Sequence, residues 1–333
     1  MSLLTTIKSC YTKARGSGNL IFFDSALTNV VDQGVKFEVR VASVLAKMAD
    51  TSPEDKKNDK AFVNPFLKPE KELIISDINS GYLLLLNKFC IIPYHLLLVS
   101  KTFIEQGTPL NHVDFDAILQ VVSKMTEPSV TFYNSGTNSG ASQPHKHIQI
   151  VPLTTGLEES PVVALWLRSQ PQVDEVFSSH ELGFVHWGVK LNPKIMELVY
   201  PETDSLDKVT EYLKEQYMNL LKEIFKFWTY SKAAQKTSIG SLPLLSESTP
   251  FDPALTLNMS YNLIFTKSAM LIIPRSVRDT EGIPINSLAF AGLLLCKSDE
   301  QSKLVSETGP LKILAASGFP SQSSSTLKLN AHM

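Results

Sequence analysis

Apolar residues recur with two different periods along the chain, and these periods predict a protein of the α+β class. A period near 3.6 places apolar side chains on one face of a helix, whereas a period of two places them on one face of a strand. The helical period marks residues 3–14, 114–125, 206–228 and 285–297, with two shorter helical segments before Gly318. The expected architecture is a mixed or antiparallel sheet with flanking helices.

The alternating period predicts several short strands. They are expected at residues 34–41, 72–75, 82–86, 89–92, 96–99, 130–134, 259–265 and 270–273. Asn87 and Lys88 separate two apolar runs and therefore predict a tight hairpin. Polar stretches at 51–60 and 231–253 predict loops, and the pattern is weak between residues 154 and 201.

Two segments of the chain repeat one order of residues. YLLLLNKFCIIPYH (82–95) and YNLIFTKSAMLIIPRS (261–276) each run from Tyr through an apolar run, a polar residue with Lys, a second apolar run and Pro to a basic residue. Two unrelated hairpins could share this order. Alternatively, the chain holds two related lobes, and the expected division is a catalytic lobe at 1–165 and a second lobe at 166–333 that completes the site.

The most distinctive stretch is FYNSGTNSGASQPHKHIQI, residues 132–150. A loop rich in Gly, Ser and Asn separates an apolar strand from a second alternating run. The strand period places His145, His147 and Gln149 on one face, and Lys146 and Ile148 on the other. Glycines let the backbone approach a ligand closely, and loop N–H groups can bind an anion. The stretch therefore predicts a phosphate held against an imidazole.

His147 is the candidate nucleophile. A neutral imidazole can attack phosphorus and form a covalent phosphoramidate, which divides one transfer into two steps. Two other interpretations stay open. A histidine pair also suits zinc, although Gln149 is a poor third ligand. Both histidines could also be ordinary strand residues beside a polar loop. We assign no metal ligands.

Composition and charge limit the possible partners. The chain has 333 residues, 43% of them apolar, and a net charge of −2. This charge gives no general attraction to nucleic acid or membrane, so an anion site must be local. Three dispersed cysteines, no apolar signal segment and no long apolar span predict a reducing cytoplasmic setting, with the nucleus as the alternative.

The stretch at 132–150 resembles the active-site segment of the fungal diadenosine tetraphosphate phosphorylases, also called ATP adenylyltransferases. This family is the transferase branch of the histidine-triad superfamily. YLLLLNKFCIIPYHLLLVS, MSYNLIFTKSAMLIIPRS, INSLAFAGLLLCK and a late GFP match in the same order, so the resemblance covers most of the chain. It implies an α+β fold with two related lobes.

The resemblance also implies a reaction and a set of site residues. Diadenosine tetraphosphate and phosphate give ATP and ADP, reversibly, through AMP bound covalently to His147. ADP-sulfate or ADP phosphorolysis is a further implied activity. His145 and Gln149 flank the nucleophile, and Gln149 contacts phosphate. The implied nucleotide-binding positions are Lys47, Asn87, Lys88, Asn134, Gly140, Ala141, Ser142, Gln143, Gln149, Asn286, Ser287, Leu288, Leu293 and Lys297.

Two positions depart from the family pattern. Leu288 stands where the pattern has Thr, and Leu293 where it has Met. These changes bear on the preferred dinucleotide and not on the chemistry. Lys88 and Lys297 lie beside apolar runs with no neighbouring acid in the sequence, which favours a role in phosphate binding.

The implied ligands are nucleotides and phosphate. No tightly bound cofactor is expected, but Mg²⁺ or Mn²⁺ is expected to accompany the polyphosphate. A monomer is compatible with the sequence. The nearest alternative enzyme is a hexose-1-phosphate uridylyltransferase, which reads His-Pro-His-Gly-Gln where this chain has Lys146 and Ile148. A nucleotide-binding protein without turnover is the alternative from another class.

Overall fold

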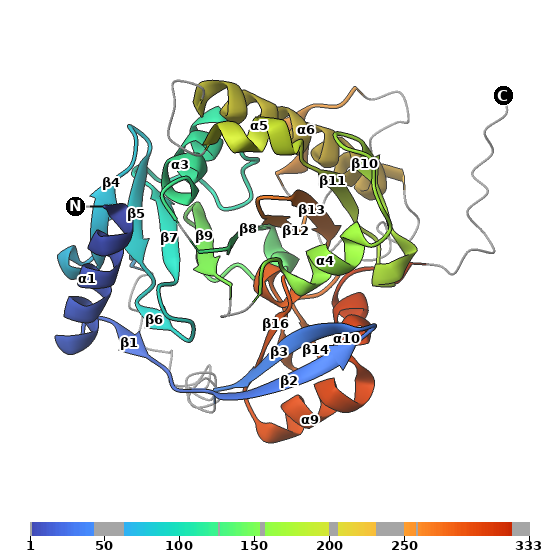
Figure 1. Ribbon diagram of the computed structural model, residues 1–333, viewed down its shortest axis with the longest axis horizontal. Helices are drawn as coiled ribbons and strands as arrows, with labels where there is room; N and C mark the ends of the chain where they lie inside the picture. The colour runs from blue at the N-terminus through green and yellow to red at the C-terminus, as the bar shows by residue number, and fades with distance from the viewer. Residues whose placement is uncertain are drawn as a thin grey trace, which may run out of the picture.

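The computed structural model of the chain confirms the α+β class, with one large antiparallel sheet and flanking helices (Figure 1). It describes residues 2–42, 63–125, 127–153, 157–199, 206–230, 250–257 and 259–321. Lys47 and the predicted loop at 51–60 lie outside the described residues, as does most of the predicted loop at 231–253.

A sheet of nine strands forms the centre of the molecule, and its order is β10-β11-β13-β12-β8-β9-β7-β5-β4. All neighbouring strands in it are antiparallel. The strands are β4 (Ile74–Asp77), β5 (Tyr82–Leu86), β7 (Leu96–Ser100), β8 (Ser129–Ser135), β9 (His147–Pro152), β10 (Val176–Phe177), β11 (Trp187–Lys190), β12 (Tyr261–Phe265) and β13 (Ala269–Pro274). The early strands fill one half of the sheet and the late strands the other, and β8 and β12 join the halves.

Helices cover one face of this sheet. The amphipathic pattern at 206–228 forms α6 (Leu206–Tyr230), which packs beside α3 (His112–Val122) above the central strands (Figure 1). α1 (Leu3–Gly16) lies at the β4 edge, and the short α5 (Pro193–Met196) lies near α6. Ile148, Tyr133 and Leu263 point from the sheet into this core, together with Phe115 and Tyr217 of the helices.

A second layer covers the opposite face. It contains a small sheet of β2 (Ala26–Asp32), β3 (Val35–Val41) and β16 (Leu293–Cys296), in the order β16-β3-β2. The helices of this layer are α4 (Pro161–Leu167), α8 (Ser287–Phe290), α9 (Asp299–Thr308) and α10 (Pro310–Ser317). Phe132 and Ile264 meet Trp166 and Phe290 in this second core. β14 (Asp279–Thr280) and β15 (Ile283–Pro284) form a short hairpin next to it.

The predicted tight hairpin at Asn87 and Lys88 is wrong. β5 pairs with β7, and Leu86 lies opposite Leu96, so the connection runs from residue 87 to residue 95. The second apolar run forms β6 (Phe89–Cys90), which pairs in parallel with β1 (Ile21–Phe22). In the later segment β12 and β13 do form a direct hairpin. The two segments therefore share a sequence order but not a local structure.

The predicted helix at 285–297 is also wrong. Only Ser287–Phe290 is helical, and the chain then turns into β16, which pairs in parallel with β3. Gly292 has a φ of 103° in this turn. An apolar run of this length does not distinguish a buried strand from a buried helix, and here pairing with β3 decides between them.

Candidate active site

The histidine stretch forms an inner strand of the sheet. β9 begins at His147 and lies between β7 and β8, where His147 faces Val99 and Gln149 faces both Leu97 and Phe132. His145 precedes the strand and makes an isolated bridge with Glu105. The predicted alternation is confirmed, because Ile148 packs in the core below the helices whereas His147 and Gln149 line a cavity.

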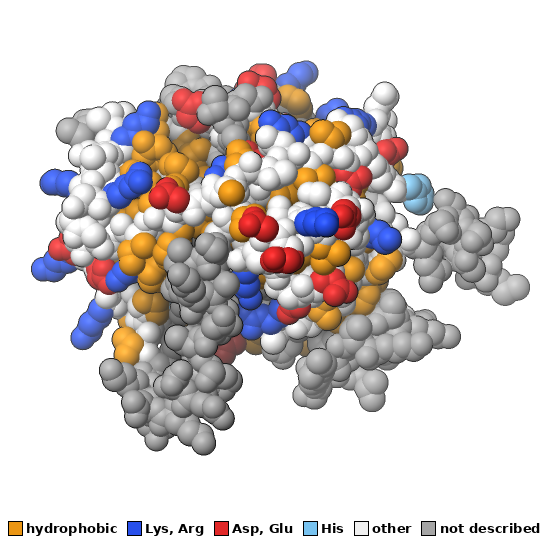
Figure 2. All heavy atoms as spheres, turned by 90° about the horizontal axis from the view of Figure 1, so that it is seen from below, with side chains coloured by type: hydrophobic (Ala, Val, Ile, Leu, Met, Phe, Trp, Pro, Cys, Tyr) orange, Lys and Arg blue, Asp and Glu red, His pale blue; other side chains and the backbone are white. Residues whose placement is uncertain are grey.

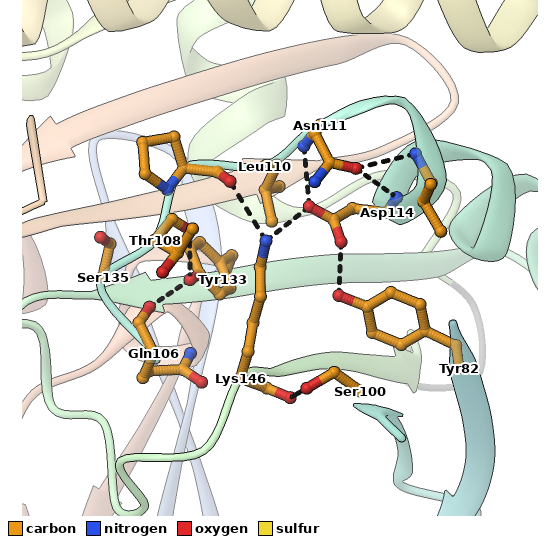
Figure 3. Close-up of polar contacts among 12 residues, drawn as sticks. Tyr82, Ser100, Gln106, Thr108, Leu110, Asn111, Asp114, Tyr133, Ser135 and Lys146 are labelled. Carbon is orange, nitrogen blue, oxygen red and sulfur yellow. Dashed lines mark hydrogen bonds and ion pairs between the residues drawn. The ribbon is translucent and has the colours of Figure 1, made fainter. Parts of the chain in front are cut away.

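Lys146 anchors this strand from the helix side of the sheet (Figure 3). Its side chain is fully buried, and Nζ lies 2.5 Å from Oδ2 of Asp114 and 3.1 Å from the carbonyl oxygen of Pro109. Tyr82 donates to the other oxygen of Asp114, and the backbone N–H of Asn111 also donates to this carboxylate. Burial lowers the pKa of Lys146, and the negative charge of Asp114 opposes this shift. The pair fixes the strand between the two active-site histidines.

The ring of His147 is neutral, and only one of its two nitrogens is engaged in a hydrogen bond to the described residues. Its Nδ1–H donates to the carbonyl oxygen of His145 at 2.9 Å. Nε2 makes no hydrogen bond to the described residues, so its lone pair is available. Burial lowers the pKa of His147 to about 4. The imidazole is therefore uncharged near neutral pH, which is the form that can act as a nucleophile.

Gln106 holds the backbone of His147 in place. Its Oε1 accepts from the N–H of His147 at 2.8 Å, and its Nε2 donates to the carbonyl oxygens of His147 and Asn134 at 3.1 and 2.8 Å. Tyr133 donates to the carbonyl oxygen of Gln106 in turn (Figure 3). This amide thus joins the ends of β8 and β9 on both sides of the glycine-rich loop.

His145 has both ring nitrogens engaged. Asn64 accepts from the N–H of Phe66 through Oδ1, so its Nδ2 donates to Nδ1 of His145 at 3.0 Å. Nε2–H of His145 then donates to the carbonyl oxygen of Ser100 at 2.7 Å. With these nitrogens occupied, the histidine pair does not offer two free metal ligands. His145 instead presents its carbonyl oxygen to His147.

The loop between the two strands, residues 136–143, offers free backbone donors. Gly136 and Gly140 both have positive φ, at 79° and 81°, and a short turn of 3-10 helix lies between them. The N–H groups of Asn138 and Ser139 bond to Ser260 Oγ and the Gly136 carbonyl. Those of residues 140–143 bond to none of the described residues. Consecutive N–H groups of this kind bind anions.

A cavity of about 580 Å³ opens beside His147 and Gln149. The segment at 63–70 forms one wall. Its Phe66 ring meets His145 edge-on and is tilted against His147, with centroid distances of 5.8 Å and 5.3 Å. The predicted binding residues Asn87, Lys88, Ser142 and Gln143 also line this cavity. The structure therefore brings together six of the predicted site residues.

A second cavity, of about 420 Å³, is lined in part by the other end of the same loop. Gly140, Asn286 and Lys297 line it together with Arg278, whose Nη2 donates to the carbonyl oxygen of Ala141 at 3.2 Å. In the described part of the chain no ion pair involves Lys297. Two basic side chains thus face a space adjacent to the histidine cavity.

Besides His145 and Ala141, four predicted residues in the described part of the chain do not line these two cavities. Asn134 is buried and accepts from Asn262 and from the N–H of Ser287 through Oδ1. Ser287 is also buried and donates to the carbonyl oxygen of Tyr133, so both residues join the two halves of the sheet. Leu288 and Leu293 lie at a separate small cavity of about 20 Å³. Their effect on a nucleotide would be indirect in this arrangement.

Lys88 has a partner that the local sequence did not reveal. Its Nζ lies 2.5 Å from Oε1 of Glu70, and both side chains line the histidine cavity. The expectation that no acid accompanies Lys88 is therefore wrong. Both side chains are over one third exposed, so the pair is screened by solvent and can be broken by a ligand.

Several residues of the site were not predicted from the sequence. His95, Gln106, Asn64 and Phe66 all contact His145, His147 or Gln149. His95 and Gln106 lie 54 and 41 residues before their partners in the sequence, so no local period connects them. The conspicuous Pro-Tyr-His at the start of β7 was a usable signal for His95, because a polar residue there interrupts an apolar run.

Three further observations bear on possible ligands and partners. Among the described residues, no cluster of three His, Cys, Asp or Glu side chains lies close enough to hold a metal ion. Across the same residues, no helix has the length and apolar character to span a membrane. The visible part of one face carries basic, acidic and apolar side chains side by side and no field of one sign (Figure 2).

The fold and the site define a nucleotidyltransferase of the histidine-triad type. The family model described as the Ap4A phosphorylase N-terminal domain matches residues 1–166, and that described as the ATP adenylyltransferase C-terminal domain matches residues 180–320. The chain belongs to the diadenosine tetraphosphate (Ap4A) phosphorylase family. The family resemblance seen in the sequence is thereby confirmed.

Two curated Saccharomyces cerevisiae proteins are similar to this chain. One, described as diadenosine 5',5'''-P1,P4-tetraphosphate phosphorylase 2, is 28% identical over 309 residues, which cover 86% of this chain and 84% of that protein. The other, described as protein APA1, is 27% identical over 347 residues, 96% of this chain and 95% of that protein. The crystal structure of yeast Ap4A phosphorylase Apa2 in complex with AMP has 25% identity and a TM-score of 0.74, and the match covers 98% of this chain and 100% of that chain.

Proposed function

We propose that this protein catalyses the phosphorolysis of diadenosine tetraphosphate to ATP and ADP through AMP bound to His147. One observation carries the proposal: His147 is buried and neutral, its Nδ1–H is occupied, and its remaining nitrogen belongs to a ring that lines a cavity beside free loop N–H groups. The names of the similar yeast proteins and the AMP complex of one of them support the choice of an adenine dinucleotide.

In the first step Nε2 of His147 attacks an α-phosphorus of the dinucleotide. The new N–P bond forms as the P–O bond that joins this α-phosphorus to the rest of the chain breaks, and the other adenosine leaves with three phosphates as ATP. In the second step an oxygen of inorganic phosphate attacks the same phosphorus, the N–P bond breaks, and ADP leaves. One bond forms and one breaks in each step. Over both steps one phosphoanhydride P–O bond replaces another, which suits a reversible reaction.

The surrounding groups suit the charges of this reaction. The N–H groups of residues 140–143 can stabilise charge that develops on the α-phosphate. Lys88 in the first cavity, and Arg278 and Lys297 in the second, can neutralise the polyphosphate. We propose that the divalent cation enters with the polyphosphate as part of the substrate, and that Mg²⁺ or Mn²⁺ serves.

Gln149 makes the protein a transferase and a poor hydrolase. An amide donates and accepts hydrogen bonds but does not titrate near neutral pH, so it cannot act as a general base toward water. Inorganic phosphate already carries negative charge and needs less help as an acceptor. The adenylyl intermediate should therefore resist water and react with phosphate.

Product analysis tests this function. The protein is incubated with diadenosine tetraphosphate, Mg²⁺ and inorganic phosphate, and the nucleotides are separated. We expect equal amounts of ATP and ADP from the unmodified protein and none from His147→Ala. His145→Ala should retain more activity, because the interaction of His145 with His147 uses a backbone carbonyl. Steady release of AMP at the same rate with and without phosphate would instead indicate a hydrolase.

A further inference from the structure

The side-chain amide of Gln149 is held by a chain of hydrogen bonds whose direction can be derived. The chain starts at Asn87, directly after β5. Oδ1 of Asn87 accepts from the backbone N–H of Phe89 at 3.2 Å. A backbone N–H can only donate, so this contact fixes which end of the Asn87 amide points elsewhere. Its Nδ2 therefore points toward Nδ1 of His95, 3.1 Å away.

His95 transmits this direction to Gln149. Because Nδ1 of His95 accepts from Asn87, the single proton of the neutral ring must be on Nε2. Nε2 lies 2.9 Å from Oε1 of Gln149 and donates to it. The ring is 8% exposed, lies 6.1 Å from the ring of Phe132 and is joined through its backbone carbonyl to the N–H of Asn87. It therefore has little freedom to reorient.

The consequence is a defined polarity at the cavity wall. Oε1 of Gln149 is occupied by His95, and no hydrogen bond from Nε2 of Gln149 reaches any described residue. The two N–H donors of Gln149 are thus left for the cavity that this residue shares with His147. With the reverse orientation, the amide would place its N–H groups against the N–H of His95 and its oxygen toward an incoming anion. Both changes would be unfavourable for binding phosphate.

We propose that His95 is a positioning residue that fixes the amide of Gln149 with its N–H donors toward the phosphate oxygens in the cavity. His95 itself does not touch the reacting atoms. This inference rests on the proposed phosphorolysis, and it deepens it by naming the residue that orients the phosphate-binding amide. The role requires a donor at the position of Nε2 and does not require a titrating group.

Two substitutions separate the donor from the shape of the ring. His95→Phe keeps a planar ring beside Phe132 but leaves Oε1 of Gln149 without a partner. His95→Gln replaces the ring by an amide whose N–H groups can donate to the same oxygen. We expect kcat/KM for phosphorolysis to fall roughly tenfold or more in His95→Phe, mainly through a higher KM for phosphate, and to recover largely in His95→Gln.

His186→Phe is the matched control. His186 is a fully buried histidine that also has both ring nitrogens engaged, since its Nδ1–H donates to the Phe184 carbonyl and its Nε2 accepts from the N–H of Ser179. It lines neither the histidine cavity nor the second cavity. Its replacement should lower thermal stability to an extent similar to His95→Phe and leave KM for phosphate unchanged. Unchanged kinetics in His95→Phe, or an equal loss in both His95 variants, would overturn the proposal.

The tautomer of His95 can be measured without any substrate. Side-chain nitrogen NMR of the full chain, with the His95 signal assigned by its absence in His95→Gln, should show a proton on Nε2 and none on Nδ1. A proton on Nδ1 would overturn the proposal even if His95→Phe does not fold. If the unmodified protein forms no ATP and ADP from the dinucleotide, the proposed function fails, and the tautomer still decides the orientation of Gln149.

Discussion

At the scale of single residues, the central feature is a set of histidines whose protons are placed by backbone groups. His147 donates to the carbonyl oxygen of His145, and His145 donates to the carbonyl oxygen of Ser100. Neither interaction needs a charged ring. Burial lowers the pKa of both rings, to about 4 for His147. Removal from water therefore prepares the nucleophile, and no acidic side chain of the described residues bonds to its ring.

This arrangement predicts an unusual pH dependence for the first chemical step. A histidine with an ordinary pKa near 6.5 would be mostly protonated at pH 5.5, whereas His147 with a pKa of about 4 would remain almost entirely neutral. The rate of adenylylation of the protein should stay nearly constant from pH 8 to about pH 5.5 and fall only as the pH approaches about 4. Rapid-quench measurement of ATP release from one turnover checks this.

The free energy of unfolding must be measured at the same pH values as the rate. His95, His147 and His186 each have a pKa lowered to about 4 by burial, so the unfolded chain binds protons that the folded protein does not. The free energy of unfolding should therefore decrease as the pH falls from about 6.5 toward 4. Circular dichroism at each pH separates this loss from catalysis. A rate that falls to half near pH 6.5 in folded protein would contradict the account.

Part of the site could be predicted at this scale. The period of two correctly placed His147 and Gln149 on one face and Lys146 on the other. The partners of His95 and Gln106 could not be predicted, because they lie 54 and 41 residues further along the chain. The local sequence marked His95 only as a polar residue beside an apolar run. The Glu70 partner of Lys88 was hidden for the same reason.

At the scale of elements, the glycine-rich loop is fitted closely against the second half of the chain. A Cβ atom on Gly140 would lie 2.5 Å from the carbonyl oxygen of Ile285 and 2.8 Å from Cβ of Asn286. Both distances are shorter than a non-bonded contact of a Cβ atom allows, so a side chain at this position would push the loop away from the start of α8. Two features therefore require glycine at this position: the close approach of the second half of the chain and the positive φ.

Gly140→Ala should therefore lower kcat/KM by more than tenfold. Gly183→Ala is the matched control, because Gly183 also has a positive φ, 69°, but a Cβ atom added there would meet no other atom within 4 Å. Both substitutions should cost about 1–2 kcal/mol for the left-handed backbone. Only the change at Gly140 should displace the loop and reduce activity. Equal activity in the two variants, measured with the same dinucleotide, would show that the contact with Ile285 has no functional role.

Long amphipathic helices and most strands were predictable, whereas the pairing of two short apolar runs was not. The pattern at 206–228 identified α6, because a helix of this length repeats its apolar positions often enough for the helical period to be recognised. The apolar runs that form β6 and β16 are too short to show a period of their own. The structure of each run depends on a strand far away in the sequence: β6 pairs with β1, and β16 pairs with β3. Local patterns cannot report pairing of that kind.

At the scale of the whole molecule, one continuous sheet joins the two halves of the chain at the site. β8 and β12 pair directly, and the buried amides of Asn134 and Asn262 bond across this junction at 2.8 Å. The glycine-rich loop leaves β8 there and lines one cavity with Ser142 and the other with Gly140. In the proposed reaction a dinucleotide would reach both cavities, and it would therefore contact both halves of the chain.

The two cavities predict separate effects of their lysines. Lys297→Ala should weaken binding of diadenosine tetraphosphate much more than binding of AMP, because Lys297 lines only the second cavity. Lys88→Ala should also weaken dinucleotide binding, although less, since Lys88 first has to leave Glu70. A charged contact to phosphate is typically worth about 1.5–3 kcal/mol.

Calorimetry on His147→Ala protein, which cannot turn over the ligand, measures these affinities. Lys226→Ala is the control, because Lys226 pairs with Glu223 on the exposed side of α6. Unfolding curves should show little change in any of the three lysine variants. Unchanged dinucleotide affinity in both Lys88→Ala and Lys297→Ala would identify them as ordinary surface residues.

The most direct test is to trap the intermediate. The protein is incubated with diadenosine tetraphosphate and Mg²⁺ in the absence of phosphate, quenched and analysed by intact-mass and peptide mass spectrometry. We predict about one equivalent of ATP released per protein and AMP attached to the peptide that contains His147, as expected of a stalled covalent intermediate. Added phosphate should then release the label as ADP. Turnover to ATP and ADP with no AMP on the protein, or AMP attached equally in His147→Ala, would contradict the account.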